Sequence, residues 1–182
     1  MAEHYRRVSN GRGNSKFIHC DCFNDEEHSI TRSGIIPFYI DGNEIYFILG
    51  VDSVWGTLSD FAGQKQKRED VFGCAKRESR EETLDILSNV EKSDLKTCFL
   101  AHDNLSLTFF YPISKYEADL LNRGFSQINS RRAEMKAIRH LSSVEFIHAI
   151  KHNQPKIYIT LRELLFDHIE NICPTIYEHY KK

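Results

Sequence analysis

The stretch Gly63–Glu82, which reads GQKQKREDVFGCAKRESREE, carries three glutamates close to its end. A helical pattern is expected over residues 70–84, and within it Glu78, Glu81 and Glu82 share one side. Like charges at this spacing destabilise a helix by about 0.2–0.5 kcal/mol per pair, whereas a face built for solubility alternates its signs. The residues alone leave two alternatives open: a solvated helix face, or a carboxylate site for a divalent cation.

The surroundings of these glutamates suit a hard cation. The helix dipole stabilises acidic groups at the N-terminal end of a helix. It does not account for these glutamates, because they lie beyond the first helical turn. Gly63 lets the backbone come close and offer a carbonyl oxygen. Because Mg²⁺ and Mn²⁺ bind carboxylate and carbonyl oxygens and keep several waters for substrate phosphates, a site for one of these ions is the functional alternative.

The chain as a whole has the composition of an ordinary globular protein. Its 182 residues suffice for one domain with a full core, and its formal net charge of −2 gives no general attraction to nucleic acid or membrane. No secretory signal is visible, and apolar runs such as IIPFYI are too short to span a bilayer. The five cysteines are odd in number and scattered, which favours a reducing, cytoplasmic compartment over a disulfide framework.

The N-terminal part predicts an arm followed by strands. Residues 1–16 are polar and basic and are expected to form a flexible arm, with a single domain over residues 17–182. FIHCDCF, from residue 17, predicts a strand that places Cys20 and Cys22 on one face as small core residues. SGIIPFYI and EIYFILGV, joined by DGN, predict an antiparallel hairpin.

The part after the acidic helix alternates strands and helices without regular βαβ order. KTCFLAH and LSLTFFYP predict a second strand pair, SKYEADLLNRGF a helix capped by Ser114, EMKAIRHLS a strand and SSVEFIHAIKHN a helix. A C-terminal extension over residues 155–182 contains IYITLRELLFDHIENI, which predicts one long amphipathic helix stopped or bent by Pro174. Its apolar stripe, which begins at Tyr158, either packs on its own domain or forms a homodimer contact.

The stretch that begins at Gly63 also resembles a known motif, the Nudix box, written G-x5-E-x7-R-E-U-x-E-E-x-G-U with U aliphatic. Five residues separate Gly63 from Glu69, seven more lead to Arg77 and Glu78, and SREE follows. Every charged position of the box is filled at the right spacing, which makes the match far more specific than a lone GxGxxG. The looser likeness covers residues 33–150 and includes SDFAGQ, which resembles the family's DFGGK-type approach to the box.

The end of the box departs from the family pattern. Ser79 stands at an aliphatic position, Leu84 at the glycine and Asp85 at the last aliphatic position. We expect Asp85 to take the left-handed turn, because Asp tolerates positive φ better than most residues, and Ile86 to supply the aliphatic contact.

The resemblance implies an α/β (α+β) fold of the Nudix type, an α/β/α sandwich with a mixed sheet, here with an added C-terminal helix. It implies a pyrophosphohydrolase that depends on Mg²⁺ or Mn²⁺ and acts on a nucleoside-diphosphate-linked or polyphosphate substrate by water attack on phosphorus. The implied metal ligands are Glu78 and Glu82, with Glu81 as a ligand to a further ion or a base, and the carbonyl of Gly63.

The resemblance also implies the remaining roles in the site. Glu69 and Arg77 are expected to form a structural ion pair that positions the loop against the helix. The general base is a box glutamate, Glu78 or Glu81, or a later acidic residue, for which Glu134 is the candidate; a solvated loop position is the alternative. Asp103 is a weaker candidate of the same kind.

Four further residues are candidates for substrate binding. Lys65, Lys67 and Arg68 form a basic cluster within the box loop, which is either ordinary surface charge or a contact for a polyphosphate or an RNA backbone. Trp55 lies in the loop before the box and either stacks on a base or packs in the core or at its rim.

Two functions from different classes follow. The first is the hydrolase, with a nucleotide-type small molecule or capped RNA as its substrate and no membrane partner. The second is a Nudix-fold module that binds a nucleotide or RNA without catalysis. The hydrolase is favoured because a catalytically inactive member should have lost a box carboxylate, whereas this chain keeps all of them.

Overall fold

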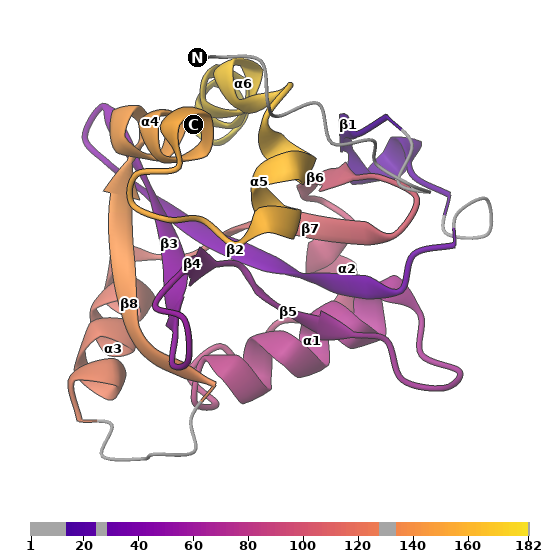
Figure 1. The fold of residues 1–182 in the computed structure, drawn as a ribbon, viewed down its shortest axis with the longest axis horizontal. Coiled ribbons are helices and arrows are strands. Elements are labelled where there is room, and N and C mark those ends of the chain that lie inside the picture. Colours follow the sequence, from indigo (N-terminus) through magenta and orange to yellow (C-terminus); the bar gives the residue numbers. More distant parts are fainter. Residues whose placement is uncertain (1–13, 25–28, 128–133, 182) are drawn as a thin grey trace.

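A mixed β-sheet with helices on both faces forms the architecture (Figure 1). The computed structural model describes residues 14–24, 29–127 and 134–181. Along the chain its elements are β1 (Lys16–His19), the 3-10 helix η1 (Cys20–Cys22), β2 (Arg32–Asp41), β3 (Glu44–Asp52), β4 (Leu58–Ser59), β5 (Phe61–Gln64), α1 (Val71–Glu82), α2 (Lys92–Leu95), β6 (Phe99–His102), β7 (Ser106–Pro112), α3 (Lys115–Ser126), β8 (Met135–Ser142), α4 (Ser143–His152), α5 (Ile159–Leu165) and α6 (Ile169–Tyr180).

The strands pair in the order β1-β6-β7-β2-β3-β4, while β5 also pairs with β2 and β8 with β3. β2 and β7 run parallel, and the other described pairs are antiparallel. This arrangement confirms the expected mixed sheet. It also confirms the two hairpins, β2–β3 and β6–β7.

β2 positions the beginning of the box. The hairpin turn between β2 and β3 contains Gly42, whose φ of +62° suits a residue without a side chain. The C-terminal half of β2, next to that turn, pairs with β3, whereas residues 32–35 at its N-terminal end pair with β5. The N-terminal half of β2 therefore holds β5, and with it Gly63, against the sheet.

Two apolar clusters lie on opposite faces of the sheet. α1 and α3 cover one face, and α4, α5 and α6 cover the other (Figure 1). Alternation along β2 separates them, because successive side chains of a strand point to opposite faces. Ile35 belongs to the cluster that contains Val71 of α1, and Ile36 belongs to the cluster that contains Leu161 of α5 and Ile172 of α6.

α1 begins as expected and ends in a left-handed turn. Asp70 is its N-cap, and the Asp70 Oδ1 atom accepts a hydrogen bond from the Gly73 N–H at 2.7 Å. The expected positive φ of Asp85 is confirmed at +62°, and Leu84, at the glycine position of the box, also has a positive φ of +59°. Because a side chain disfavours this conformation, the turn is more strained than the glycine form would be. Ile86 is partly buried against the apolar cluster on the face of the sheet that α1 covers.

The prediction of a strand from residue 17 is confirmed as far as His19 and is wrong beyond it. β1 ends at His19, and the next three residues form η1, where the His19 side chain accepts from the Asp21 N–H. Cys20 is buried while Cys22 is exposed, so the two do not share a buried face. Of the expected arm, residues 1–13 lie outside the described part of the chain, and Lys16 already belongs to β1.

The prediction of one long C-terminal helix was also wrong. The segment forms α5 and α6, which are separated by residues 166–168, and α6 continues through Pro174. Tyr158 precedes α5 and is exposed, whereas the other residues of the stripe are buried: Leu161, Leu164, Leu165, Ile169 and Ile172. The break lets both short helices turn their apolar sides to the sheet, so the stripe packs on its own domain. A homodimer contact stays a prediction.

Among the described helices, none combines the length and apolar character needed to cross a membrane.

Candidate functional site

The three glutamates of α1 have different environments. Glu78 and Glu82 are buried, while Glu81 is exposed to solvent. Glu78 lies directly over the box glycine, because a Cβ atom added to Gly63 would stand 2.2 Å from Glu78 Oε1. No side chain larger than glycine fits there unless this carboxylate moves. The backbone of β5 and the carboxylate of α1 therefore come together only because residue 63 is glycine.

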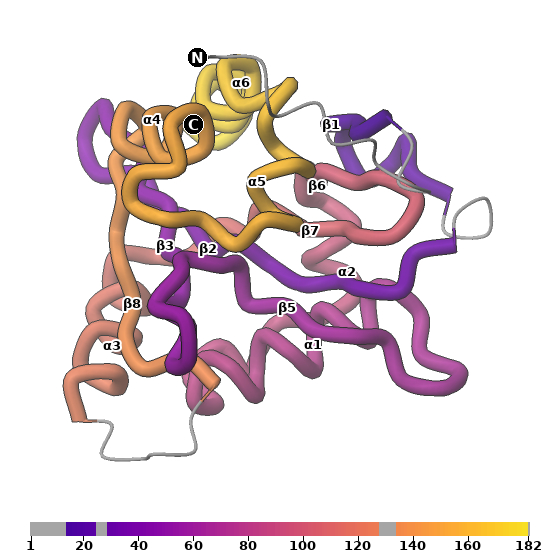
Figure 2. The backbone as a smooth tube through the Cα atoms, viewed as in Figure 1, coloured from indigo at the N-terminus to yellow at the C-terminus, as the bar shows by residue number. Residues whose placement is uncertain are grey.

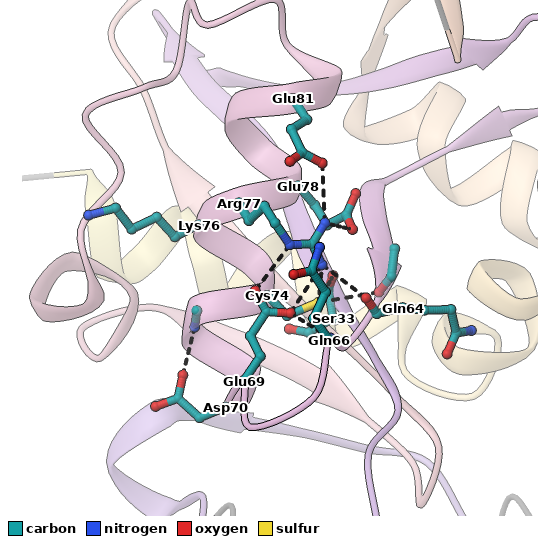
Figure 3. Close-up of polar contacts among 12 residues, drawn as sticks. Ser33, Gln64, Gln66, Glu69, Asp70, Cys74, Lys76, Arg77, Glu78 and Glu81 are labelled. Atoms are coloured by element: carbon teal, nitrogen blue, oxygen red, sulfur yellow. Dashed lines mark hydrogen bonds and ion pairs between the residues drawn. The ribbon is translucent and has the colours of Figure 1, made fainter.

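Arg77 connects the box loop to the acidic helix (Figure 3). Its Nε and Nη2 atoms donate to the two carboxylate oxygens of Glu69, each at 3.1 Å, and Nη2 also donates to the Gln64 carbonyl at 2.9 Å. Its Nη1 atom donates to Glu78 and to Glu81 Oε2, the latter at 3.2 Å. The hydrogen bonds from Arg77 lower the pKa of Glu69, and Glu69 in turn raises the pKa of Arg77. Arg77 thus fixes the loop and also neutralises part of the acidic face.

Glu82 has the most unusual environment of the three. Burial, first of all, and the nearby charges of Asp60, Glu78 and Glu134 together raise its pKa to about 9. Its Oε2 atom is buried and has no hydrogen-bond partner among the described residues. Burial also raises the pKa of Glu78, which Arg77 partly offsets. Two adjacent buried carboxylates with raised pKa values form a site that attracts positive charge.

A buried ion pair next to Glu82 was missed from the sequence. Arg32, at the start of β2, donates through Nη2 to Asp60 Oδ1 at 2.6 Å and through Nη1 to Asp60 Oδ2 at 3.0 Å. The Tyr158 ring lies over the Arg32 guanidinium at 5.4 Å, so the segment before α5 reaches this site. The signal for the pair was weak: Asp60 lies in SDFAGQ, but Arg32 is 28 residues away and comes next to it only through strand pairing.

The two candidates for a later acidic base lie in different places. Glu134 is exposed, and its charge raises the pKa values of both Glu78 and Glu82, which places it on the same side of the molecule as these carboxylates. Asp103 is buried in the β6–β7 turn, where its Oδ1 atom accepts from the N–H groups of Leu105 and Ser106 at 2.8 and 2.7 Å. Asp103 therefore stabilises the β6–β7 turn. Glu134 remains the later acidic candidate for the general base.

The predicted substrate contacts lie at the surface. Lys67 and Arg68 are exposed and Lys65 is half-buried, all in the loop between β5 and α1. Arg68 has a φ of +70°, so the loop makes a sharp turn at this residue. Trp55 lies in the turn between β3 and β4 and is 81% exposed, which excludes the alternative that it packs into the core.

The donor chemistry fits a hard cation, although the side chains are not gathered around one point. Within the described residues, no group of three His, Cys, Asp or Glu side chains is arranged to hold a metal ion. Glu78 is instead bonded to Arg77. Mg²⁺ and Mn²⁺ nevertheless prefer oxygen donors of the kind found here: the buried Glu82 oxygen, which has no partner in the described part of the chain, and the Glu78 carboxylate over Gly63.

Solved structures with the same fold are Nudix proteins. A mutT/nudix family protein from Listeria innocua superposes with a TM-score of 0.53 at 13% identity, over 84% of this chain and 97% of that one. The Nudix hydrolase RenU from M. smegmatis gives 0.50 at 10% identity, over 82% and 89% of the two chains. No protein-family model matches the chain, and no curated protein sequence matches it. The likeness thus establishes a Nudix fold.

Proposed function

We propose that the chain is a metal-dependent Nudix pyrophosphohydrolase. Its substrate would be a nucleotide-type polyphosphate, such as a nucleoside triphosphate, a dinucleoside polyphosphate or an mRNA cap. The observation that carries the proposal is the Glu82 carboxylate, buried beside Glu78 and Asp60 with one oxygen unpartnered among the described residues. A group of this kind is unfavourable in a folded protein unless a ligand compensates it.

In this proposal Glu78 and Glu82 would hold Mg²⁺ or Mn²⁺ and the Gly63 carbonyl would complete the ligand set, while Glu81 would bind a further ion or act as the base. The ion would neutralise the diphosphate and lower the pKa of a bound water. Glu78 would exchange its bond to Arg77 for the cation, and Arg77 would keep its two bonds to Glu69. Arg77 would therefore hold the loop in both states.

The proton of the attacking water requires a base close to the carboxylates. Glu81 is exposed at the end of α1, and Glu134 lies within electrostatic range of Glu78 and Glu82. Either group could accept the proton without being buried itself.

The basic residues Lys65, Lys67 and Arg68 lie in the loop between β5 and α1 and would attract phosphates. All five cysteines are free thiols, which agrees with the proposed reducing compartment.

A substrate panel with Mg²⁺ and Mn²⁺ tests this proposal on the wild type and on Glu82→Gln. The panel contains nucleoside triphosphates, diadenosine polyphosphates, nucleotide sugars, inositol pyrophosphate and capped RNA. We expect one class to be cleaved, with turnover reduced at least about 100-fold in Glu82→Gln, because a lost metal ligand removes several kcal/mol of charge stabilisation. Glu178→Gln, on the exposed side of α6, is the matched control and should be fully active.

The outcomes separate the two function classes. Full turnover in Glu82→Gln would show that the metal assignment is wrong. Absence of cleavage across the panel, together with nucleotide binding measured by calorimetry, would favour the non-catalytic nucleotide- or RNA-binding module.

A further inference from the structure

Trp55 is exposed to a degree that packing does not explain. It is the single tryptophan of the chain, and its relative exposure is 81%, with the neighbouring Val54 at 74%. Tryptophan is highly buried on average, and its large flat ring usually contributes area to a core or an interface. Two adjacent apolar side chains held in solvent therefore indicate a surface that a ligand covers.

The turn that carries Trp55 is ordered by its own hydrogen bonds. Asp52 Oδ1 accepts from the N–H groups of Val54 and Trp55 at 2.9 and 2.5 Å. The backbone of Asp52 also bonds to Gly56 and to Thr57, at 3.0 and 2.9 Å. These bonds fix the backbone on both sides of the tryptophan. A ring presented by such a turn loses little conformational entropy when a ligand binds.

The same turn lies next to the carboxylate site. The Ser53 N–H donates to the Glu134 carbonyl at 2.9 Å, and Figure 2 shows the turn between β3 and β4 beside the start of β8. Glu134 acts electrostatically on both Glu78 and Glu82. Glu134 therefore contacts the tryptophan turn through its backbone and acts on the two buried carboxylates through its charge.

A cation stands beside the turn as well. Lys136 of β8 places its Nζ atom 3.7 Å from the point where a Cβ atom on Gly56 would lie. The turn with its exposed tryptophan thus lies beside both an ammonium group and Glu134. The aromatic face suits the flat ring of a base, and the ammonium suits a phosphate, so the two together fit a nucleotide better than a ligand without a base.

We propose that Trp55 stacks on the nucleobase of the substrate, and that this substrate is a purine nucleoside polyphosphate. The assignment rests on the proposed function and narrows its substrate class. A purine offers the larger π-face to the indole ring. Stacking on an exposed aromatic residue reads the presence of a base without hydrogen bonds to its edge, so we expect adenine and guanine nucleotides to bind similarly. Inositol pyrophosphate and other polyphosphates without a base would not use this residue.

The fluorescence of the single tryptophan reports this contact directly. With Mg²⁺ present, the full chain is titrated with α,β-methylene ADP, which carries a purine, and with methylenediphosphonate, which lacks the nucleoside. We expect the purine analogue to quench the Trp55 emission and methylenediphosphonate to leave it unchanged. In calorimetry, Trp55→Leu should weaken binding of the purine analogue about tenfold or more and leave methylenediphosphonate unaffected.

Two variants control for the kind of side chain and for its place. Trp55→Phe keeps an aromatic face and should recover most of the affinity. Tyr116→Leu removes another exposed aromatic ring, on α3, and should leave binding of the purine analogue as in the wild type. A Trp55→Phe variant as weak as Trp55→Leu would contradict stacking.

The results also separate this inference from the proposed function. If hydrolysis depends on Glu82 but the two probes bind equally, with no change in emission and no effect of Trp55→Leu, the stacking role is overturned and the hydrolase stands. If the purine analogue quenches the emission while no substrate is cleaved, the stacking role stands and the hydrolase fails. Absence of binding of the purine analogue overturns the stacking role.

Discussion

Asp60, which directly precedes β5, and Glu82, the last residue of α1, are two buried carboxylates, and the protein compensates their charges very differently. Asp60 is fully buried, and Arg32 donates to both of its oxygens while the Ser59 hydroxyl adds a third bond at 3.0 Å. Glu82 is buried to a similar extent, yet one of its oxygens has no partner among the described residues. A charge in the interior is tolerated when it is paired and is costly when it is not.

This difference separates a carboxylate that belongs to the scaffold from one that we assign to a ligand. The protein compensates Asp60 with its own arginine, so Asp60 needs nothing further. The charge of Asp60 in turn adds to the raised pKa of Glu82. Asp60 therefore increases the demand for positive charge at Glu82, and Arg32 opposes this effect, because the Glu82 charge raises the pKa of Arg32.

Removal of Arg32 should have the largest effect on stability. Arg32→Met leaves Asp60 buried without its partner, and we expect a loss of about 3–5 kcal/mol in the free energy of unfolding. Urea denaturation followed by circular dichroism measures the change. The double variant Arg32→Met with Asp60→Leu should recover most of the loss, because both charges are then absent.

A matched control for Arg32 is the pair Lys76–Glu91, whose side chains are about half-exposed. Lys76→Met should change the free energy of unfolding very little, because solvent screens such pairs. An equal loss in Lys76→Met and Arg32→Met would contradict the distinction between a buried and a surface pair.

The second largest effect concerns the stability of the metal-free protein as a function of pH. The pKa of Glu82 is raised from 4.5 to about 9, so the folded state favours the protonated form. Stability from this group is fully present below pH 4.5 and is lost as the pH rises toward 9. We expect metal-free Glu82→Gln to be more stable than the wild type by up to about 3 kcal/mol at pH 7, with a smaller difference at pH 4.5.

Thermal unfolding in the presence of a chelator, from pH 4.5 to 9, measures this difference. Added Mg²⁺ should raise the melting temperature of the wild type and leave that of Glu82→Gln nearly unchanged, because an ion that binds the folded state stabilises it. If the stability of the two proteins depended on pH in the same way, burial of the Glu82 carboxylate would not destabilise the folded protein. The proposed difference between Glu82 and Asp60 would then be wrong.

The smallest effect is expected at the exposed glutamate. The Glu81 side chain is 58% exposed, and its contact with Arg77 is one of several that this arginine makes. Glu81→Gln should therefore change the free energy of unfolding by less than about 0.5 kcal/mol. A turnover reduced together with unchanged stability would support a catalytic role, whereas unchanged turnover would leave Glu78 and Glu134 as the candidate bases.

Several local elements were predictable because their causes are local. Periodicity placed α1 within two residues of its ends, and the side chains of Asp70 and Ser114 cap α1 and α3. The spacing between Glu69 and Arg77 led to a pair whose four polar atoms meet in the structure. The predictions were wrong at Cys20–Cys22 and at residues 166–168, where the chain turns and thereby keeps its apolar residues against the sheet. Periodicity in the sequence does not reveal such turns.

The sequence by itself determined that three carboxylates lie on one helix, because helical geometry depends only on residue spacing. The tertiary structure decided that Glu78 and Glu82 are buried while Glu81 is exposed, because β5 packs on one side of α1 and solvent lies on the other. It also brought Arg32 to Asp60 and the Trp55 turn to Glu134 through the pairing of distant strands. Burial and long-range pairing depend on the whole fold, so the electrostatics of the site could only be obtained from the three-dimensional structure.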